Sequence, residues 1–228
     1  MHLLFDMKKL LLLLIHFGCG TAAMSQDSAP FASHLLFSVG PALPLGSFSS
    51  TSFDREYPAF ADVGTFIQLN YTQSLKPHIA LGATAGYRRN PFLEEEFAAP
   101  GDELVQELKS KPWQTGYVLA DVQVQAPLGR NGMAFIRGSA GGAFIRAASL
   151  QVQTPYGTIS RSSDKRVTPT FGATTGLKGE QNRIVIGIET SLLFMRPSLE
   201  VKNQQGATDQ FHQPMNSANF SLSVGYRL

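Results

Sequence analysis

The chain has 228 residues, of which 16% are charged, and its formal net charge is +2. Its 16 Phe, 6 Tyr and single Trp argue against a disordered chain, and the small net charge gives no sign of a nucleic-acid-binding surface. A helical membrane protein needs repeated apolar runs of about 18 residues or more, whereas this chain has one short run and a mean hydropathy of −0.04. Few charges, many aromatics and 21 glycines favour an all-β sandwich or barrel, including a membrane barrel.

The first 25 residues have the pattern of a cleaved secretory signal peptide. Lys8 and Lys9 form a positive start, residues 10–15 form an unbroken apolar run, and small residues lead to an Ala23-Met24-Ser25 cleavage motif. The run is too short for a spanning helix. We therefore predict a signal peptide at residues 1–25 and a single mature domain at residues 26–228.

The only cysteine, Cys19, lies inside this predicted signal. A lipid-attachment site needs a small residue before the cysteine, which Gly18 supplies, and usually a Leu three residues before it, where this chain has His16. We expect Cys19 to be lost with the signal, and lipidation is the alternative. A mature chain without cysteine needs no disulfide in an oxidising compartment, so both features point to the bacterial envelope.

Along the mature chain the apolar residues recur with a period of two, which predicts strands. In residues 184–194, for example, Ile184, Ile186 and Ile188 alternate with Val185, Gly187 and Glu189. Each predicted strand has nine residues or more, which meets the ~9–11 residues that a tilted strand needs to cross a bilayer. In chain order the eight predicted strands are residues 33–43, 63–71, 79–87, 116–126, 132–148, 167–177, 184–194 and 220–228.

The connections between these strands alternate between long and short. The short ones carry the turn residues Pro, Gly or Asn. In an up-and-down barrel this alternation places all long loops at one end and all short turns at the other, as in outer-membrane barrels. The long connections are residues 44–58, 90–112, 149–166 and 197–215, and the short ones are residues 72–77, 127–131 and 178–182.

The last ten residues, 219–228, alternate up to the chain end. They resemble the terminal strand of bacterial outer-membrane β-barrel proteins, which usually end in Phe with an aromatic residue two positions before it. The barrel assembly machinery reads that strand as a sorting signal in the family. The matching residues here are Phe220, Leu222, Val224 and Tyr226, and the chain departs from the pattern by ending in Leu228.

Residues 39–48 (Val-Gly-Pro-Ala-Leu-Pro-Leu-Gly-Ser-Phe) resemble the opening of the small, porin-like group described as the outer membrane protein beta-barrel domain. The resemblance extends over residues 31–228 and rests on pattern and architecture. It implies an all-β fold, an eight-stranded antiparallel up-and-down transmembrane β-barrel in the outer membrane of a Gram-negative cell. The alternation by itself permits the apolar face to point inward or outward, and the signal, the loops and the C-terminus favour outward.

A few charged residues lie on the polar face of the predicted strands. If the turn near Gly129 pairs residues whose numbers sum to 258, Asp121 lies opposite Arg137 in the lumen. Glu189 is expected to join them, since an unpaired buried carboxylate is costly. We predict a structural lumen polar network of Asp121, Arg137 and Glu189, with a proton or ion site as the alternative.

The other candidate binding or catalytic residues are better explained by structural roles. Acidic residues cluster at 94–107, where a solvated external loop is expected ahead of a cation site, and Asp102 is expected to cap a short helix extending to Ser110. The remaining histidines lack zinc spacing, and no nucleophile elbow is present. We predict no catalytic residue, metal or cofactor. The histidines are His34, His78 and His212; the expected interfacial aromatics are Trp113, Tyr117, Tyr87, Tyr71 and Phe194.

The resulting prediction is an integral outer-membrane barrel whose four long external loops have a structural, adhesion or surface-interaction role. An eight-stranded lumen is too narrow for a general diffusion pore. The expected partners are outer-membrane lipid, the barrel assembly machinery and an envelope or surface protein, but no nucleic acid. Two alternatives stay open, namely a barrel enzyme that modifies outer-membrane lipid and a secreted lipocalin-like barrel that binds a small ligand.

Overall fold

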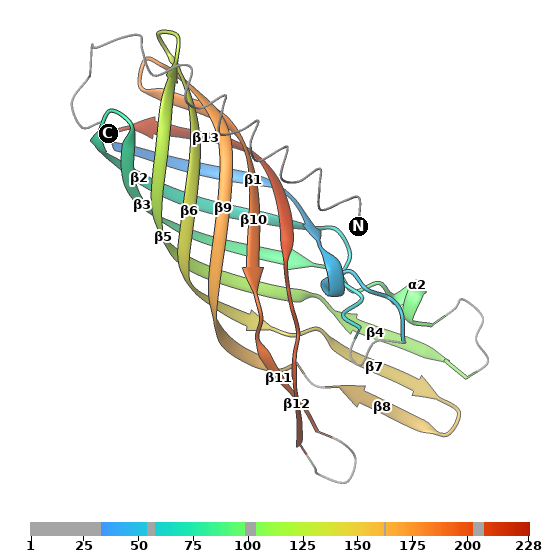
Figure 1. The fold of residues 1–228 in the computed structure, drawn as a ribbon. Coiled ribbons are helices and arrows are strands. Elements are labelled where there is room, and N and C mark those ends of the chain that lie inside the picture. The colour runs from blue at the N-terminus through green and yellow to red at the C-terminus, as the bar shows by residue number, and fades with distance from the viewer. Residues whose placement is uncertain (1–32, 54–57, 99–103, 162, 203–207) are drawn as a thin grey trace, which may run out of the picture.

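Eight antiparallel strands close into a tilted barrel in the computed structural model of this chain (Figure 1). The structure describes residues 33–53, 58–98, 104–161, 163–202 and 208–228, so the predicted signal peptide lies outside the described residues. The order around the barrel is β1-β13-β10-β9-β6-β5-β3-β2, and β1 pairs with β13 to close it. These strands are β1 (Ser33–Pro44), β2 (Gly64–Lys76), β3 (Ile79–Asn90), β5 (Trp113–Leu128), β6 (Gly132–Arg146), β9 (Lys165–Gln181), β10 (Ile184–Met195) and β13 (Ser217–Arg227).

The predicted eight-stranded up-and-down barrel is therefore confirmed. The strands are longer than predicted at the short connections, where the turns shrink to residues 77–78, 129–131 and 182–183. Polar residues such as Gln73 and Glu180 end the apolar alternation, but their backbones still pair with the neighbouring strand. Residues with positive φ make these tight reversals, as at Gly129 (φ 67°) and Asn182 (φ 50°).

The long connections carry elements of their own at the barrel end opposite the short turns and the C-terminus (Figure 1). A three-stranded sheet has the order β4-β7-β8, and β11 pairs with β12 in a separate hairpin. These elements are η1 (Gly46–Phe48), α2 (Glu94–Phe97), β4 (Glu107–Lys111), β7 (Ser149–Thr154), β8 (Gly157–Arg161), β11 (Ser198–Lys202) and β12 (Thr208–His212).

The predicted helix from Asp102 to Ser110 is wrong. Residues Glu107–Lys111 form β4, which pairs with β7 over five residues, and Asp102 lies outside the described residues. A short isolated helix is marginal in water, whereas a strand gains a neighbour's backbone hydrogen bonds. The helix of this loop is α2, which has only four residues.

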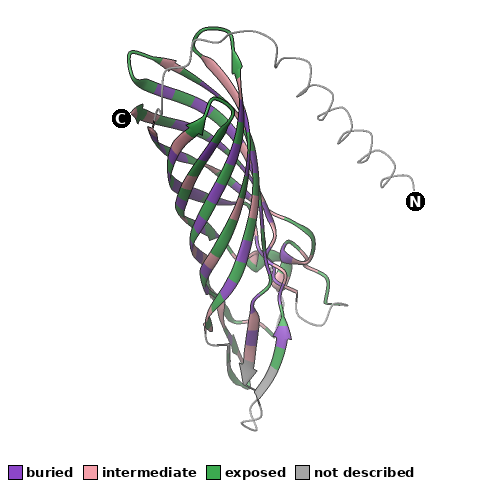
Figure 2. Ribbon diagram, turned by 60° about the vertical axis from the view of Figure 1, so that its left-hand side comes forward, coloured by how far each residue is buried: buried purple, intermediate pink, exposed green. Residues whose placement is uncertain are grey.

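The barrel wall alternates in burial along every strand, as the purple and green bands in Figure 2 show. On β10, Val185 and Glu189 are buried in the lumen, whereas Ile184, Ile186 and Ile188 are more than half exposed on the outer wall. The outer wall thus presents Ile, Leu, Val, Phe and Tyr side chains, and the lumen contains polar ones. An apolar exterior contradicts the lipocalin-like alternative, which needs an apolar interior, and matches a barrel that faces lipid.

Among the described residues no helix is long and apolar enough to cross a membrane.

The outer part of the lumen is filled by an apolar plug, defined here as the buried cluster around Phe48, Trp113, Leu193, Met195 and Met215. Phe48 comes from the loop after β1 and is fully buried, with its ring 5.6 Å from that of Trp113 in an edge-to-face contact. The plug therefore closes the barrel with side chains from the wall and from the loops.

Two of the predicted interfacial aromatics are wrong. Trp113 and Tyr117 are only 4% and 2% exposed because they point into the plug, and Trp113 Nε1 donates to the Ala59 carbonyl at 2.9 Å. The other three, Tyr71, Tyr87 and Phe194, are about 40% exposed on the outer wall.

Candidate functional site

The turn between β5 and β6 sets which lumen residues face one another. Arg137 lies opposite Gln123, and Asp121 lies opposite Ser139, so the predicted pairing of Asp121 with Arg137 is wrong. Paired residue numbers sum to 260 because the turn is centred on Arg130, one residue later than expected. A shift of two in the sum leaves every side chain on its predicted face, so both residues are still buried in the lumen.

Arg137 of β6 forms an ion pair with Glu189 of β10 on the lumen side of β9, with Nη2 and Oε2 2.9 Å apart and both side chains 2% exposed. Glu189 also accepts a long hydrogen bond from Gln68 Nε2 at 3.5 Å, and Gln68 in turn accepts one from Tyr117 Oη at 3.3 Å. β2, β5, β6 and β10 are thus joined by one network. A buried pair with additional hydrogen bonds is tolerated where a lone charge is not.

Asp121 belongs to a second network, made of neutral donors. Its carboxylate accepts hydrogen bonds from Thr84 Oγ1 at 2.6 Å, Ser139 Oγ at 2.5 Å and Asn70 Nδ2 at 3.0 Å. Thr72 Oγ1 donates to Asn70 Oδ1 at 2.7 Å and orients that amide. The structure therefore brings Arg137 and Glu189 together and places Asp121 apart, with partners that satisfy its charge by hydrogen bonding.

Sequence reasoning missed Arg88, which is 1% exposed and lies where the polar lumen meets the plug. Its guanidinium donates to Ser217 Oγ and to the Met215 carbonyl, the latter at 3.3 Å, and lies over the Phe48 ring at 5.2 Å. Arg88 therefore attaches β3 to the start of β13, to the segment before it and to the plug. The alternation of the strand could have identified Arg88 as a lumen residue, because Arg88 follows Thr84 and Gly86 at every second position, on the inward face of β3.

Little free space remains in the lumen. A cavity of about 10 Å³ lies beside Arg137, Ser139 and Tyr117, which is near the smallest free volume that can hold one water. The plug lies beyond this cavity, toward the end of the barrel that carries the long connections, and its buried side chains occupy the lumen there.

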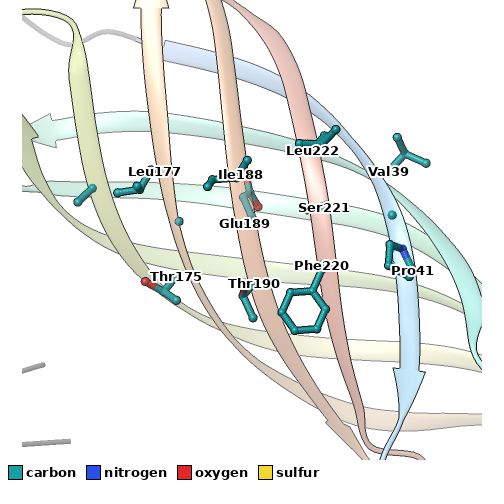
Figure 3. Close-up of a pocket in the computed structure, with 13 residues that line it drawn as sticks. Val39, Pro41, Thr175, Leu177, Ile188, Glu189, Thr190, Phe220, Ser221 and Leu222 are labelled. Atoms are coloured by element: carbon teal, nitrogen blue, oxygen red, sulfur yellow. The ribbon is translucent and has the colours of Figure 1, made fainter. Parts of the chain in front are cut away.

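A larger groove of about 630 Å³ lies on the outer wall, where β1, β13, β10, β9 and β6 run side by side (Figure 3). Thr190 of β10 lies between Phe220 of β13 and Thr175 of β9, and Leu177 lies beyond Thr175 on the same strand. Its lining is mostly apolar, so the groove belongs to the lipid-facing surface.

The C-terminal strand closes the barrel beside this groove. β13 pairs with β1 on one side and β10 on the other, and Leu228 N donates to the Ser33 carbonyl at 2.9 Å. All five predicted sorting residues are exposed on the outer wall: Phe220 (47%), Leu222 (67%), Val224 (53%), Tyr226 (46%) and Leu228 (67%).

Outside the barrel, the β4-β7-β8 sheet has two different edges. At β4, Ser110 N donates to Glu94 Oε1 of α2 at 2.9 Å, so α2 covers part of that edge. β8 is the terminal strand on the other side, and no strand of the described chain pairs with its outer edge. The β7–β8 turn presents Tyr156, whose side chain is 91% exposed. This sheet is the candidate functional site on the outer surface.

The β11–β12 hairpin is attached to the barrel wall by charged groups. Arg166 of β9 binds Asp164 Oδ2 through Nε at 3.0 Å and Glu200 Oε1 through Nη2 at 2.5 Å. Partial burial raises the pKa of the Asp164 carboxyl, but hydrogen bonds from the Glu200 N–H and from Arg166 outweigh it and lower that pKa overall. The carboxylate is therefore a stable acceptor for the hairpin backbone.

Within the described residues, no three His, Cys, Asp or Glu side chains form a group that could hold a metal ion. The acidic loop contributes local contacts instead, such as the Glu107–Lys109 ion pair at 2.8 Å. His34 lies near Glu180 at 3.5 Å, and His78 lies 3.2 Å from the Gln125 carbonyl.

No family model matches the chain, and no curated protein matches it either. Among solved structures, Neisserial surface protein A is similar, with a TM-score of 0.51 at 9% identity over 86% of this chain and 97% of that one. A major outer membrane protein from Thermus thermophilus has a TM-score of 0.48 at 13% identity, over 86% of this chain and 100% of that one. Ail, the attachment invasion locus protein of Yersinia pestis, has a TM-score of 0.43 at 10% identity, over 87% and 97%.

The first of these likenesses shows the fold, that of a small eight-stranded outer-membrane barrel. The apolar outer wall, the polar lumen and this fold together place the chain in the outer membrane of a Gram-negative bacterium.

Proposed function

We propose that this protein is a surface-recognition protein of the outer membrane and that its external β4-β7-β8 sheet binds a protein partner by strand addition at β8. The observation that carries the proposal is the free edge of β8 on a sheet outside the barrel, beside the fully presented Tyr156. An exposed sheet edge is a ready template for an extended segment of another chain.

The hydrogen-bonding pattern of the β7–β8 hairpin supports this mode. Its closing pair is Thr154 and Gly157, and bonded and non-bonded pairs alternate from there. Thr158 and Ser160 therefore direct their backbone N–H groups away from β7, toward the free edge. An added strand would bind these two donors and the carbonyls beside them.

The filled lumen supports recognition over transport. The plug and the two hydrogen-bonded networks occupy the lumen in the described part of the chain, and the cavity beside Arg137 has only about 10 Å³, so a passing solute would have to displace buried side chains. The same networks argue against the lipid-modifying enzyme, because the Asp121 and Glu189 carboxylates are held in buried hydrogen bonds.

We also propose the membrane partners expected from the sequence. Outer-membrane lipid would cover the apolar wall, and the barrel assembly machinery would read the outward residues of β13. An envelope or surface protein would be the partner at β8.

The test is bacterial adherence to a panel of immobilised extracellular-matrix proteins and to surfaces coated with this protein itself. Ser160→Pro removes the free-edge N–H without removing a β7–β8 bond, so we expect adherence to fall to that of cells lacking the protein. The control Ser160→Ala keeps the N–H and should adhere like wild type. Heat-modifiable gel mobility shows whether the barrel is intact in each variant. Adherence of S160P at the wild-type level, or no adherence by wild type, would contradict the proposal.

A further inference from the structure

The outer half of the barrel wall carries three charged residues that face outward, and all three are cations. They are Arg89 on β3, Arg146 on β6 and Lys165 on β9, and each is exposed. The other outward-facing residues in this half of the eight barrel strands are uncharged. A set of charges of one sign on an otherwise uncharged wall attracts ligands of the opposite sign.

The register of the sheet places these cations in one row. Arg89 lies opposite Gln114 of β5, Gln114 lies opposite Arg146, and Arg146 lies opposite Lys165. The four strands β3, β5, β6 and β9 lie side by side in the barrel (Figure 1). Neighbouring strands are about 4.8 Å apart, which makes the row about 14 Å long. Gln114 adds an amide donor between two of the cations.

The row has no counter-charge in the described part of the chain, because none of its three cations forms an ion pair there. The nearest carboxylate along the chain, that of Asp164, is bound by Arg166. Arg146 donates through Nε to Ser163 Oγ at 3.1 Å, which leaves its two terminal nitrogens for a ligand. Like charges directly opposite each other, such as Arg146 and Lys165, destabilise a sheet. A bound anion would remove that cost.

On each of the three strands, a large apolar residue lies two positions from the cation, on the same face and nearer the middle of the wall. These residues are Tyr87, Phe144 and Val167, which are 41%, 64% and 67% exposed and form a row of their own in the same register. Apolar side chains on the wall of a membrane barrel face acyl chains. The cations beside them therefore lie where the acyl chains meet the headgroups. Because barrel strands tilt, the row runs obliquely to the membrane plane and spreads its charges over the depth of the headgroup layer.

We propose that Arg89, Gln114, Arg146 and Lys165 bind the phosphate groups of a lipid in the outer leaflet. The planar guanidinium of Arg binds phosphate through two parallel hydrogen bonds, and Lys binds it as a point charge. The adjoining apolar row favours a lipid over free phosphate, because it gives the acyl chains of the same molecule a surface to cover. This site rests on the lipid contact proposed above and narrows it to one headgroup chemistry, and it does not depend on strand addition at β8.

Binding of lipid A, an acylated sugar lipid that bears phosphate groups, tests the site. The full barrel in micelles of a zwitterionic detergent is titrated with lipid A, and native mass spectrometry measures the fraction that carries the lipid. A basic residue at a lipid surface contributes about fivefold in affinity. The triple variant Arg89→Gln, Arg146→Gln, Lys165→Gln should therefore bind lipid A about 100-fold more weakly than wild type.

The matched control removes three cations from the other end of the barrel, by Lys76→Gln, Arg130→Gln and Arg183→Gln. These residues are exposed at the short turns, so the control loses the same net charge and should bind lipid A like wild type. All six positions are on the surface, and heat-modifiable gel mobility shows that each variant is folded.

Two further probes of the wild-type barrel distinguish a lipid phosphate from free phosphate. Lipid A from which the phosphates have been removed should bind wild type no better than it binds the triple variant, and inorganic phosphate in millimolar excess should not displace intact lipid A. Wild-type affinity in the triple variant, an equal loss in the control, tight binding of the dephosphorylated lipid, or displacement by inorganic phosphate would each overturn the proposal. Strand addition at β8 is tested separately by adherence, so either proposal can fail without the other.

Discussion

The two halves of the lumen are built from opposite kinds of side chain, although the same strands line both. Along β5 the inward residues begin with Trp113, Tyr117 and Leu119 in the plug and continue with Asp121 and Gln123 in the polar half. β10 changes in the same way, from apolar side chains at its outer end to Glu189. The polar half is held together by wall residues alone, whereas the plug depends on loop residues such as Phe48.

This difference indicates which half determines barrel stability. The polar half joins strands that are not direct neighbours in the ring, as Arg137 on β6 and Glu189 on β10, on either side of β9, show. The plug packs loop residues against the fixed wall of strands. We therefore expect defects in the polar half to weaken the whole barrel and defects in the plug to open the outer mouth locally.

The largest effect is expected from Glu189→Gln, which leaves Arg137 without its ion-pair partner. Removing one partner of a buried ion pair costs about 3–5 kcal/mol, so the midpoint of heat-induced unfolding should fall well below that of wild type. Glu95→Gln is the control, because Glu95 is exposed on α2 and its loss should leave the midpoint unchanged. An E189Q barrel as stable as E95Q would show that the polar half is not what holds the strands.

A smaller and more local effect is expected from Phe48→Ala. Loss of the buried ring beside Trp113 should lower the free energy of unfolding by about 3 kcal/mol. This is at the low end for Phe→Ala, because the loop can relax into the space that the ring leaves. Backbone hydrogen exchange should rise in residues 45–50 and 58–61 while the barrel strands stay protected. Phe144→Ala is the matched control, since Phe144 is 64% exposed on the outer wall of β6 and its loss should leave exchange in these two segments unchanged. Faster exchange throughout the barrel strands of F48A would refute the division into two halves.

Much of this arrangement could be predicted from the sequence. Period-two alternation and the spacing of turn residues identified all eight barrel strands and the end that carries the loops. The buried position of Asp121, Arg137 and Glu189 followed from strand face alone, which a two-residue error in register does not change.

The rest depended on contacts that no local pattern contains. The pairing of Arg137 with Glu189 rather than Asp121 joins residues 52 positions apart, and it depends on the registers of β6 and β10 against β9. Trp113 and Tyr117 are of the residue types found at membrane interfaces, but their side chains point inward, into the plug that loop residues such as Phe48 complete. β4 becomes a strand because β7 lies beside it, and its own sequence is compatible with a helix.

The central claim is that this barrel lies in the outer membrane with the β4-β7-β8 sheet outside the cell. Because the predicted mature chain has no cysteine, Tyr156→Cys and Lys76→Cys each introduce a single thiol at an exposed position, at opposite ends of the barrel. A membrane-impermeant maleimide added to intact cells should label Y156C fully and K76C only after the outer membrane is opened. Labelling of K76C but not Y156C in intact cells, or equal labelling of both, would contradict the account.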